Sequence, residues 1–541
     1  MRNSEFLVSN AMLVGDTSHS SLVDIHCVDG RIAAIVDSTG SPTTASSKPE
    51  QFDAGGRSVC ASFIDTHQHL QKAALARQFS IDFLEASPKN VHDVLELVRT
   101  ACVGRQAGEW IRGDSLDHRQ LEEARFPNRL ELDSVSPKNP VVILGRGNHA
   151  LAANTIALEI ADINFETVDP PGGRVERFDD GSPSGVLWEL GKLRLDPNRV
   201  DTVLPVYGLH ERMMSISAVG EYLLSNGITS VHDIVMDATE VRSYVRLHNE
   251  GKLPFRVQLL LRGLESKIPL EAIVATGLEQ GFGDQFLKVG GVKFSIDGAE
   301  SSNGAAIYGS YPGDAENHGL IRIEQAELDD AISRCHEAGI RAAVHAIGQR
   351  AVDMALESFE KAFQLHGRGK VRHRIEHAYF PPLQGQLARI REANLIVSTQ
   401  PAFLWHTDAI NEDHVAGLPE EMYPLRSMLD MGITVIGNSD FPVVSPNPWL
   451  GIAAAVTRQN RAGNSYGDSE SVSVVEALRM YTSAAAFSGY EEAEKGSIEV
   501  GMLADMIVLD RNPFTIPPSS LSEVRVDATV LDGKVVFERE L

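Results

Sequence analysis

The sequence predicts an α/β protein, built on a (β/α)8 barrel and a small composite β-sandwich domain formed by both ends of the chain. Two observations predict this fold. Through the middle of the 541 residues, short apolar segments alternate with amphipathic helical segments, the pattern of parallel strands joined by crossover helices. At both ends, two β-rich runs flank an Asp-Gly pair, and this pair favours a tight hairpin turn.

The terminal hairpins are expected around residues 29–30 and 532–533. Because these distant segments share one pattern, we expect them to lie in a single β-sandwich domain, formed by residues 1–61 and 490–541. The alternative is that they are two unrelated hairpins on the surface.

The barrel is expected within residues 62–489, and its later helices end near glycines, as helix C-termini often do. The count of eight strands requires that residues of about 72–205 form an insertion between the first two. An insertion this long is usually functional or a subdomain, and we expect it to act as a lid. The predicted strands cover residues 61–69, 227–235, 255–263, 290–298, 341–348, 372–380, 395–403 and 433–441. Eight parallel strands with crossover helices close into a barrel.

Charge and composition narrow the function. A net charge of −25 argues against a nucleic-acid partner, since phosphate binding requires clustered Lys and Arg. The first residues lack the basic and apolar regions of a signal peptide, and no stretch has the apolar length of a membrane span. We therefore expect a cytoplasmic protein without membrane contact that acts on a small molecule, and a homodimer is a fair expectation. The cysteines are scattered, as in a reducing compartment, and they are Cys27, Cys60, Cys102 and Cys335.

Chemically active side chains fall near the carboxyl ends of the predicted strands, where barrel enzymes place their active sites. Residues two apart on a strand point to the same face, so a His-x-His pair on the first strand can bind one ion. Imidazole and carboxylate groups suit zinc and related divalent ions. The residues are His67 and His69 on the first strand, Lys293 and Asp297 on the fourth, His345 on the fifth, His377 on the sixth and Asp440 on the eighth.

Each of these residues also has a structural alternative. His345 could be a hydrogen-bonded core histidine, and Asp440 could simply form a turn. Lys293 could be a core lysine paired with Asp297. The placement of the whole set at strand ends of one barrel favours a metal site.

The segment "HRIEH" at 373–377 also matches H-x-x-E-H, a metalloprotease pattern that requires both histidines on one helical face. A helix is expected to end near "HGRGK", and two prolines follow at 381–382, so little more than a strand fits between them. On a strand, His373 and His377 lie about 13 Å apart, too far to share an ion. Glu376 then points to the opposite face from both. We therefore expect a strand here and not a protease helix.

Several motifs together resemble the amidohydrolase superfamily, and within it the YtcJ-like branch typified by N-substituted formamide deformylase. The motifs are "ASFIDTHQHL", "GRGNHALAANTIAL", "GITSVHDI", "VKFSIDG", "VHAIGQRAVD", "HRIEHA", "STQPAFL", "GNSDFPV" and "KGSIEVGMLADMIVLDRNP". The resemblance covers nearly the whole chain. It implies a metal-dependent hydrolase barrel with a composite β-sandwich and an insertion after the first strand, as the residue patterns also predict.

The resemblance further implies a set of metal ligands and a divalent cofactor, with Zn²⁺ expected as one or two ions. His67, His69 and Asp440 would bind the first metal, and His345 and His377 the second. A carboxylated Lys293 would bridge them. The sequence departs from the family pattern at Gln349, where relatives commonly have Asp, and at residues 300–303, which differ from the expected Ser-Leu-Gly-Ser run.

The expected activity is metal-dependent hydrolysis of a carbon–nitrogen bond in a small molecule, of the amide, formamide, N-acyl or cyclic amide type, by a metal-activated hydroxide. Asp440 would act as general base and then general acid. His377 would bind the second ion or, in a one-metal site, stabilise the oxyanion. The alternatives are a deaminase of an aminated ring in the same fold and a catalytically silent scaffold. A deaminase normally adds a carboxylate on the fifth strand, which "RAAVHAIGQR" lacks.

The substrate pocket is expected to contain aromatic residues next to the strand ends. From the insertion, His149 could reach the site or only satisfy hydrogen bonds of its own subdomain. The proposed substrate contacts are Asp297, Tyr311, Phe403, Trp405 and His149.

Overall fold

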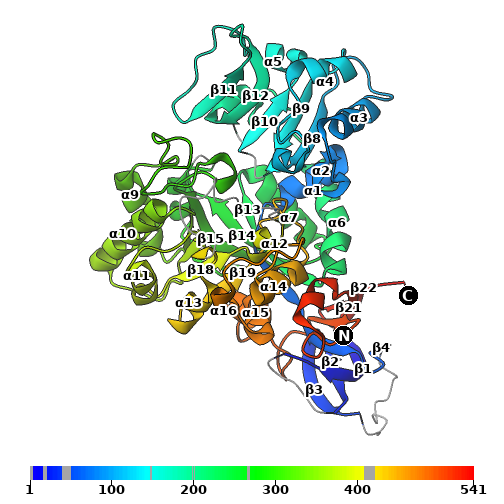
Figure 1. Cartoon of the computed structure of the whole chain (residues 1–541). Coiled ribbons are helices and arrows are strands. Elements are labelled where there is room, and N and C mark those ends of the chain that lie inside the picture. The colour runs from blue at the N-terminus through cyan, green and yellow to red at the C-terminus, as the bar shows by residue number, and fades with distance from the viewer. Residues whose placement is uncertain are drawn as a thin grey trace.

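The computed structural model describes residues 4–15, 21–38, 50–146, 149–197, 199, 201–264, 268–406 and 421–540. Residues 147–148, within the motif "GRGNHALAANTIAL", lie outside this part. Three sheets organise the described chain. In Figure 1 the sheet of the insertion lies at the top, the barrel sheet in the middle and the sheet of the two chain ends at the bottom. No helix within these ranges is both long and apolar enough to cross a membrane.

The middle sheet contains eight strands in chain order, and every neighbouring pair is parallel. This arrangement confirms the predicted barrel fold, and each strand overlaps its predicted range. The strands are β6 (Phe63–Gln68), β13 (Ile228–Val235), β14 (Arg256–Arg262), β15 (Leu287–Ser295), β16 (Ala342–Ala346), β17 (Arg374–His377), β18 (Ile396–Thr399) and β19 (Val435–Gly437). All of β13 is buried, as expected for a parallel strand covered on both faces.

The sheet closes where its last strand meets its first. The backbone N–H of Asp440 donates to the carbonyl of His67 (3.0 Å), and the N–H of His69 donates to the carbonyl of Phe441 (2.8 Å). The seam of the barrel therefore runs directly beside three of the predicted ligands.

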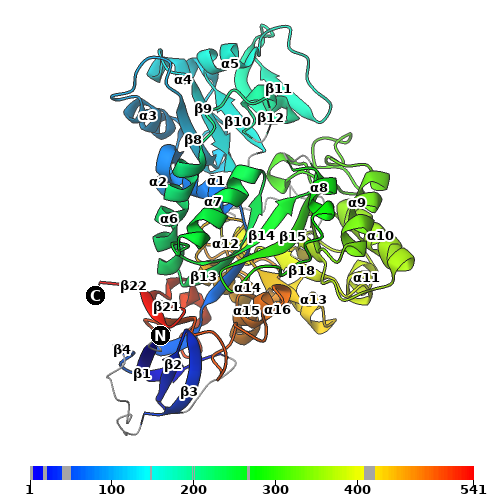
Figure 2. The same cartoon turned by 180° about the vertical axis from the view of Figure 1, so that it is seen from behind.

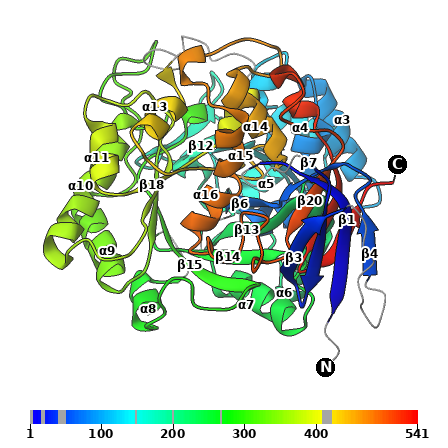
Figure 3. The same ribbon diagram turned by 90° about the horizontal axis from the view of Figure 1, so that it is seen from below.

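Helices cover the outside of the barrel (Figures 2 and 3). α9 (Gln325–Glu337) and α10 (Gln349–His366) are amphipathic, and α10 ends at Gly367 with φ +76°, which a glycine adopts without strain. The others are α1 (Leu70–Phe79), α6 (Leu209–Ser225), α7 (Ala238–Asn249), α8 (Leu270–Ala275), α11 (Gln386–Glu392), α12 (Pro401–His406), α13 (Leu425–Asp430), α14 (Pro448–Thr457), α15 (Val474–Met480) and α16 (Ser483–Ser488).

The insertion forms a six-stranded sheet with helices on both faces. Side chains alternate between two apolar cores: Ile143 of β9 belongs to one, and its neighbours Val142 and Leu144 belong to the other. The elements are β7 (Ile81–Asp82), α2 (Phe83–Ala86), α3 (Val91–Ala101), β8 (Ile111–Leu116), α4 (Arg129–Val135), β9 (Val141–Gly145), β10 (Ala150–Ala153), α5 (Thr155–Ala161), β11 (Gly173–Arg177) and β12 (Pro183–Glu189). The sheet follows α1, which packs on the barrel helix α6.

The two ends of the chain meet in the third sheet, where the strands run in the order β22-β21-β20-β5-β1-β2-β3, with β4 beside β1. This is one continuous path of hydrogen-bonded strands with an apolar core from both ends. The exact domain boundaries stay predictions. The strands are β1 (Glu5–Leu13), β2 (Val23–Val28), β3 (Arg31–Asp37), β4 (Glu50–Asp53), β5 (Ser58–Ala61), β20 (Met506–Leu509), β21 (Val526–Leu531) and β22 (Lys534–Glu538).

Both Asp-Gly pairs occupy hairpin turns, and the turns touch each other. Asp29 and Gly30 have φ of +50° and +76°, and Asp532 and Gly533 have φ of +54° and +69°, as a type I′ turn requires. A Cβ on Gly30 would lie 2.3 Å from the Asp532 Oδ1. The positive φ and this close approach together favour glycine at position 30.

Candidate active site

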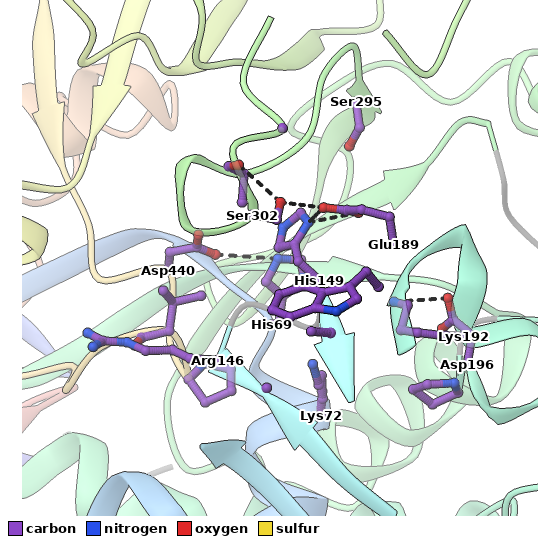
Figure 4. A pocket seen from close by; sticks show the side chains of 18 of the residues that line it. His69, Lys72, Arg146, His149, Glu189, Lys192, Asp196, Ser295, Ser302 and Asp440 are labelled. Atoms are coloured by element: carbon purple, nitrogen blue, oxygen red, sulfur yellow. Dashed lines mark hydrogen bonds and ion pairs between the residues drawn. The ribbon is translucent and has the colours of Figure 1, made fainter. Parts of the chain in front are cut away.

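A cavity of about 1720 Å³ lies between the carboxyl ends of the barrel strands and the insertion. Strand-end residues form one wall, and insertion residues such as His149, Glu189 and Lys192 form the other. Figure 4 shows side chains from both walls pointing into the same space. The expected role of the insertion as a lid remains a prediction, but its residues do line the cavity.

Three buried side chains converge on the barrel wall. One ligand atom each of His67, His377 and Asp440 lies within 4.8 Å of the others. The Asp440 Oδ1 is 3.4 Å from the His67 Nε2 and 3.4 Å from the His69 Nε2. The ring centroid of His345 is 4.3 Å from that of His377. The structure thus brings all four predicted histidines and the aspartate together.

Several donor atoms of this cluster make no hydrogen bond within the described part of the chain. They are the Nε2 atoms of His67 and His345 and the Oδ1 of Asp440, all buried. Buried polar atoms normally have partners. The His67 Nε2 and the Asp440 Oδ1 lie 3.4 Å apart, and such unpartnered imidazole and carboxylate atoms fit a bound divalent ion. The His345 Nε2 instead lies near the Asp297 carboxylate.

The backbone turns the side chains at two of the strand ends toward the barrel mouth. His377, the last residue of β17, has φ +78°, and Asp440, shortly after β19, has φ +53°. Positive φ is uncommon outside glycine, although Asp and His adopt it more readily than most residues, and at these two positions it re-aims a side chain that strand geometry alone would direct elsewhere. Because residues 374–377 form a strand, the structure excludes the helical H-x-x-E-H alternative.

Burial sets the protonation of the cluster. It lowers the pKa of His67, His345 and His377 well below the ordinary value, and the nearby Lys293 ammonium acts in the same direction. These imidazoles are therefore neutral, the form that binds metals. Burial also raises the pKa of Asp440 to about 7, although Lys293 opposes that shift.

Lys293 lies buried within this cluster. Burial lowers the pKa of Lys293 to about 8, while Glu376 opposes the shift more strongly than Asp440 does. Asp297, the alternative partner, instead accepts three backbone hydrogen bonds, from Ala306 (3.0 Å), Ile347 (3.1 Å) and Gly348 (2.9 Å). The Asp297 Oδ1 also lies 3.3 Å from the His345 Nε2. Through these contacts Asp297 fixes the backbone of the loops next to the fifth strand.

Glu376 is a site residue that the sequence reasoning missed. Its Oε2 accepts a hydrogen bond from the His67 Nδ1 (2.7 Å), and its Oε1 accepts one from the Arg374 Nε (2.7 Å). Burial alone would raise the pKa of Glu376, but Arg374 and Lys293 hold it below its ordinary value. The carboxylate therefore fixes the tautomer of His67 and leaves its Nε2 lone pair free toward the cluster.

The strand-alternation rule explains why Glu376 was missed. It places Glu376 on the face opposite to His377, but the positive φ of His377 breaks the alternation at the strand end. Both side chains can then serve the same site. A buried Arg-x-Glu pair preceding the histidine, at 374–376, was the available signal.

Two further residues, also missed, support the ligands. Asp65 accepts hydrogen bonds from the hydroxyl and the backbone N–H of Ser439 and from the Gln68 Nε2, which ties β6 to the loop carrying Asp440. The Gln400 Oε1 lies 2.9 Å from the His377 Nδ1. The first contact fixes the loop next to Asp440, and the second fixes the ring of His377 through the nitrogen that does not face the cluster.

The predicted substrate contacts lie at different depths. Phe403 and His149 line the cavity. Tyr311 is buried and donates its hydroxyl to the Ala305 carbonyl (2.9 Å), and Trp405 packs against the barrel core. The structure therefore does not place Tyr311 and Trp405 among the residues that line the cavity, whereas Asp297 does line it. All five assignments stay predictions.

His149 is held by a contact between the insertion and the barrel. Its Nδ1 lies 2.9 Å and 3.1 Å from the two carboxylate oxygens of Glu189, and the Ser302 hydroxyl donates to the same carboxylate. Burial would raise the pKa of Glu189, but His149 and Ser302 bring it down to about 2. Ser302 lies in the 300–303 run that departs from the family pattern.

An eight-stranded α/β barrel that gathers buried imidazole and carboxylate donors at its strand ends has the architecture of a metal-dependent hydrolase. The chain belongs to the Amidohydrolase family, whose model matches residues 50–537. It is accordingly a hydrolase that acts on carbon–nitrogen bonds.

Individual proteins match over nearly the full length. The chain is 31% identical to the N-substituted formamide deformylase of Arthrobacter pascens, with 100% of this chain and 99% of that protein covered. It is 26% identical to the putative amidohydrolase YtcJ of Bacillus subtilis (strain 168), with 94% of each covered. A crystal structure titled as an uncharacterized metal-dependent hydrolase from Pyrococcus furiosus is 25% identical, with a TM-score of 0.70, covering 94% of this chain and 100% of that one.

Proposed function

We propose that the protein hydrolyses the amide bond of a small molecule, of the formamide, N-acyl or cyclic amide type, with one or two divalent ions of which Zn²⁺ is the first candidate. The observation that carries this proposal is the convergence of buried ligand atoms of His67, His377 and Asp440 under a large cavity, where the His67 Nε2 and the Asp440 Oδ1 make no hydrogen bond within the described residues. The similarity to an N-substituted formamide deformylase supports the choice of an amide.

The donor set fits a metal. His67, His69 and Asp440 would hold one ion, and His345 and His377 would hold a second. A divalent ion at such a site lowers the pKa of water and polarises a carbonyl group. Lys293 would bridge the two positions as a carbamate, formed when its neutral amine adds carbon dioxide and releases a proton. The lowered pKa of Lys293 favours that neutral amine.

Side chains of the barrel would transfer the protons, orient the ligands and stabilise the developing charge. Asp440 takes the proton of the attacking water at a carboxylate oxygen and passes it to the departing nitrogen. Glu376 keeps the His67 Nδ1 protonated throughout, so that His67 presents one fixed lone pair. In a site with a single ion, His377 instead faces the carbonyl oxygen and stabilises its developing charge.

A deaminase remains the second candidate. A 5-methylthioadenosine/S-adenosylhomocysteine deaminase of Thermoanaerobacter pseudethanolicus is 27% identical, although the match covers only 33% of this chain. The strand β16, "AAVHA", carries no carboxylate that could serve as the extra acid of such an enzyme.

Product analysis on the metal-loaded protein separates these candidates. The panel is a set of formamides, N-acyl amino acids, cyclic amides and aminated purines or pyrimidines, with Asp440→Asn as the inactive control. We expect release of a carboxylic acid and an amine from an acyclic amide, or ring opening of a cyclic one. Ammonia from an aminated ring would support the deaminase, and turnover of no amide by fully metal-loaded protein would contradict the proposal.

A further inference from the structure

The helix α1 extends the active site away from the metal cluster. It begins directly after His69, and Lys72, Leu75 and Ala76 follow it along the cavity wall. Positions three, six and seven residues beyond His69 fall on one helical face. Figure 4 shows Lys72 projecting into the pocket between His69 and the Lys192–Asp196 pair.

Within the described part of the chain, the Lys72 ammonium makes no hydrogen bond or ion pair. The carboxylates that act on it, Asp114 and Asp196, do so at longer range, and Lys192 and Arg112 act against them. Asp196 is already bound to the Lys192 Nζ (3.1 Å). Together with Lys72, the four charged groups that act most strongly on it carry three positive and two negative charges, a local excess of one positive charge in a protein whose net charge is −25.

Arg112, on β8 of the insertion, is one of these cations. It also lines the cavity, its guanidinium lies 5.5 Å from the ring centroid of Tyr207, and its buried Nε makes no hydrogen bond within the described ranges. Asp114 is only 2% exposed and does not line the cavity. Its negative charge acts on Lys72 from beneath the cavity surface. A buried donor without a partner is costly, and a ligand anion would satisfy it.

We propose that Lys72 and Arg112 form a subsite for a carboxylate of the substrate. A monoanion matches the excess of one charge. Side chains three residues apart on a helix are about 5–6 Å apart at Cβ, so this carboxylate lies within a few bonds of the bond that is cleaved beside His69. The inference rests on the proposed amide hydrolysis and narrows it to N-acyl or N-formyl amino acids, in which the carboxylate is attached two bonds from the amide nitrogen.

The test compares an N-formyl or N-acyl amino acid with its neutral carboxamide on the metal-loaded enzyme. We expect the wild type to prefer the acid. Lys72→Met should lower kcat/KM for the acid by about 10- to 100-fold, the loss expected for a hydrogen bond to a charged group, and should change the value for the carboxamide by less than about 3-fold. Lys72→Arg should keep most of the preference. Lys252→Met, which removes the same charge from an exposed pair with Glu250, should change neither substrate.

A second variant distinguishes a direct contact of Lys72 with the substrate carboxylate from an effect of the net positive charge around it. Lys72→Met/Asp114→Asn restores the excess of one positive charge without an ammonium at position 72, and it relieves the unpaired Asp114. If Lys72 contacts the carboxylate, the preference for the acid stays lost. A restored preference would overturn the subsite, as would an equal loss for acid and carboxamide in Lys72→Met, or a wild type that prefers the carboxamide.

Calorimetry keeps this test independent of turnover. The probe is the free amino acid product, whose binding to the metal-loaded wild type should weaken by a similar factor in Lys72→Met while metal content and Tm remain unchanged. Absence of any hydrolysis would contradict the proposed function alone, whereas equal binding of the probe to both proteins would contradict the subsite alone.

Discussion

The two walls of the cavity are built from different interactions. On the barrel wall, His67 and His377 are nearly fully buried neutral groups whose second atoms are fixed by Glu376 and Gln400. On the insertion wall, charged side chains face the same space as ion pairs, such as Arg146 with Asp117 at 2.9 Å. We propose from this difference that the reaction takes place on the barrel wall and that the insertion wall binds the substrate.

The walls are joined at a few identifiable contacts. The Ser302 hydroxyl of the barrel donates to Glu189 of the insertion, and the Arg146 side chain donates to the Val443 carbonyl, close to Asp440. If the two walls have these separate roles, substitutions on the barrel wall should remove metal or turnover. Substitutions at the contacts between the walls should alter substrate affinity.

The largest effect is expected from His67→Ala/His69→Ala. The variant should lose bound metal and more than about 100-fold in turnover, because the ion contributes several kcal/mol to the transition state. Elemental analysis of the purified protein measures the metal, and His92→Ala, on an exposed position of α3, is the control. Equal metal content in variant and wild type would show that these histidines are not ligands.

The two histidines of "HRIEH" give the sharpest contrast within one strand region. His377→Asn should lower activity by about 100-fold, whereas His373→Asn should keep most of it. His373 accepts from the Ala342 N–H (3.0 Å) and contacts His336 (2.9 Å), so its loss should cost about 1–2 kcal/mol of the free energy of unfolding. Activity assays and thermal unfolding of both variants measure this, and the reverse ranking would show that His377 is neither a ligand nor a catalytic residue.

Lys293→Ala tests the bridging carbamate. Activity and metal content should both fall, and a small carboxylate such as acetate should restore part of each by replacing the bridging oxygens. Without the carbamate, the loss would follow only from a missing charge, and acetate would restore nothing. An unmodified amine at position 293 in a metal-loaded crystal grown with bicarbonate would also exclude it.

The smallest effect is expected from Glu189→Gln, which keeps the shape of the contact and removes its charge. His149 would lose its carboxylate partner, so we expect KM to rise by about 5-fold, equivalent to about 1 kcal/mol, with little change in kcat or metal content. Steady-state kinetics measure this, and Glu159→Gln on the exposed face of α5 is the control. Loss of metal in Glu189→Gln would mean that the insertion wall belongs to the metal centre.

The sequence by itself determined the barrel and the residues gathered at its mouth. Alternating apolar strands and amphipathic helices are local patterns, and the chain order of parallel strands then places His67, His345 and Asp440 at one end of the sheet. The Asp-Gly pairs likewise determined both terminal hairpins. Their roles as ligands stay predictions, but their proximity followed from periodicity alone.

Only the tertiary structure decided how these residues are supported and what faces them. The positive φ of His377, the contact of Glu376 with His67, and that of Glu189 with Ser302 join segments far apart in the sequence. The alternation rule holds only while a residue remains inside its strand. Beyond the strand end, packing against distant segments sets the backbone, and no local pattern encodes that packing.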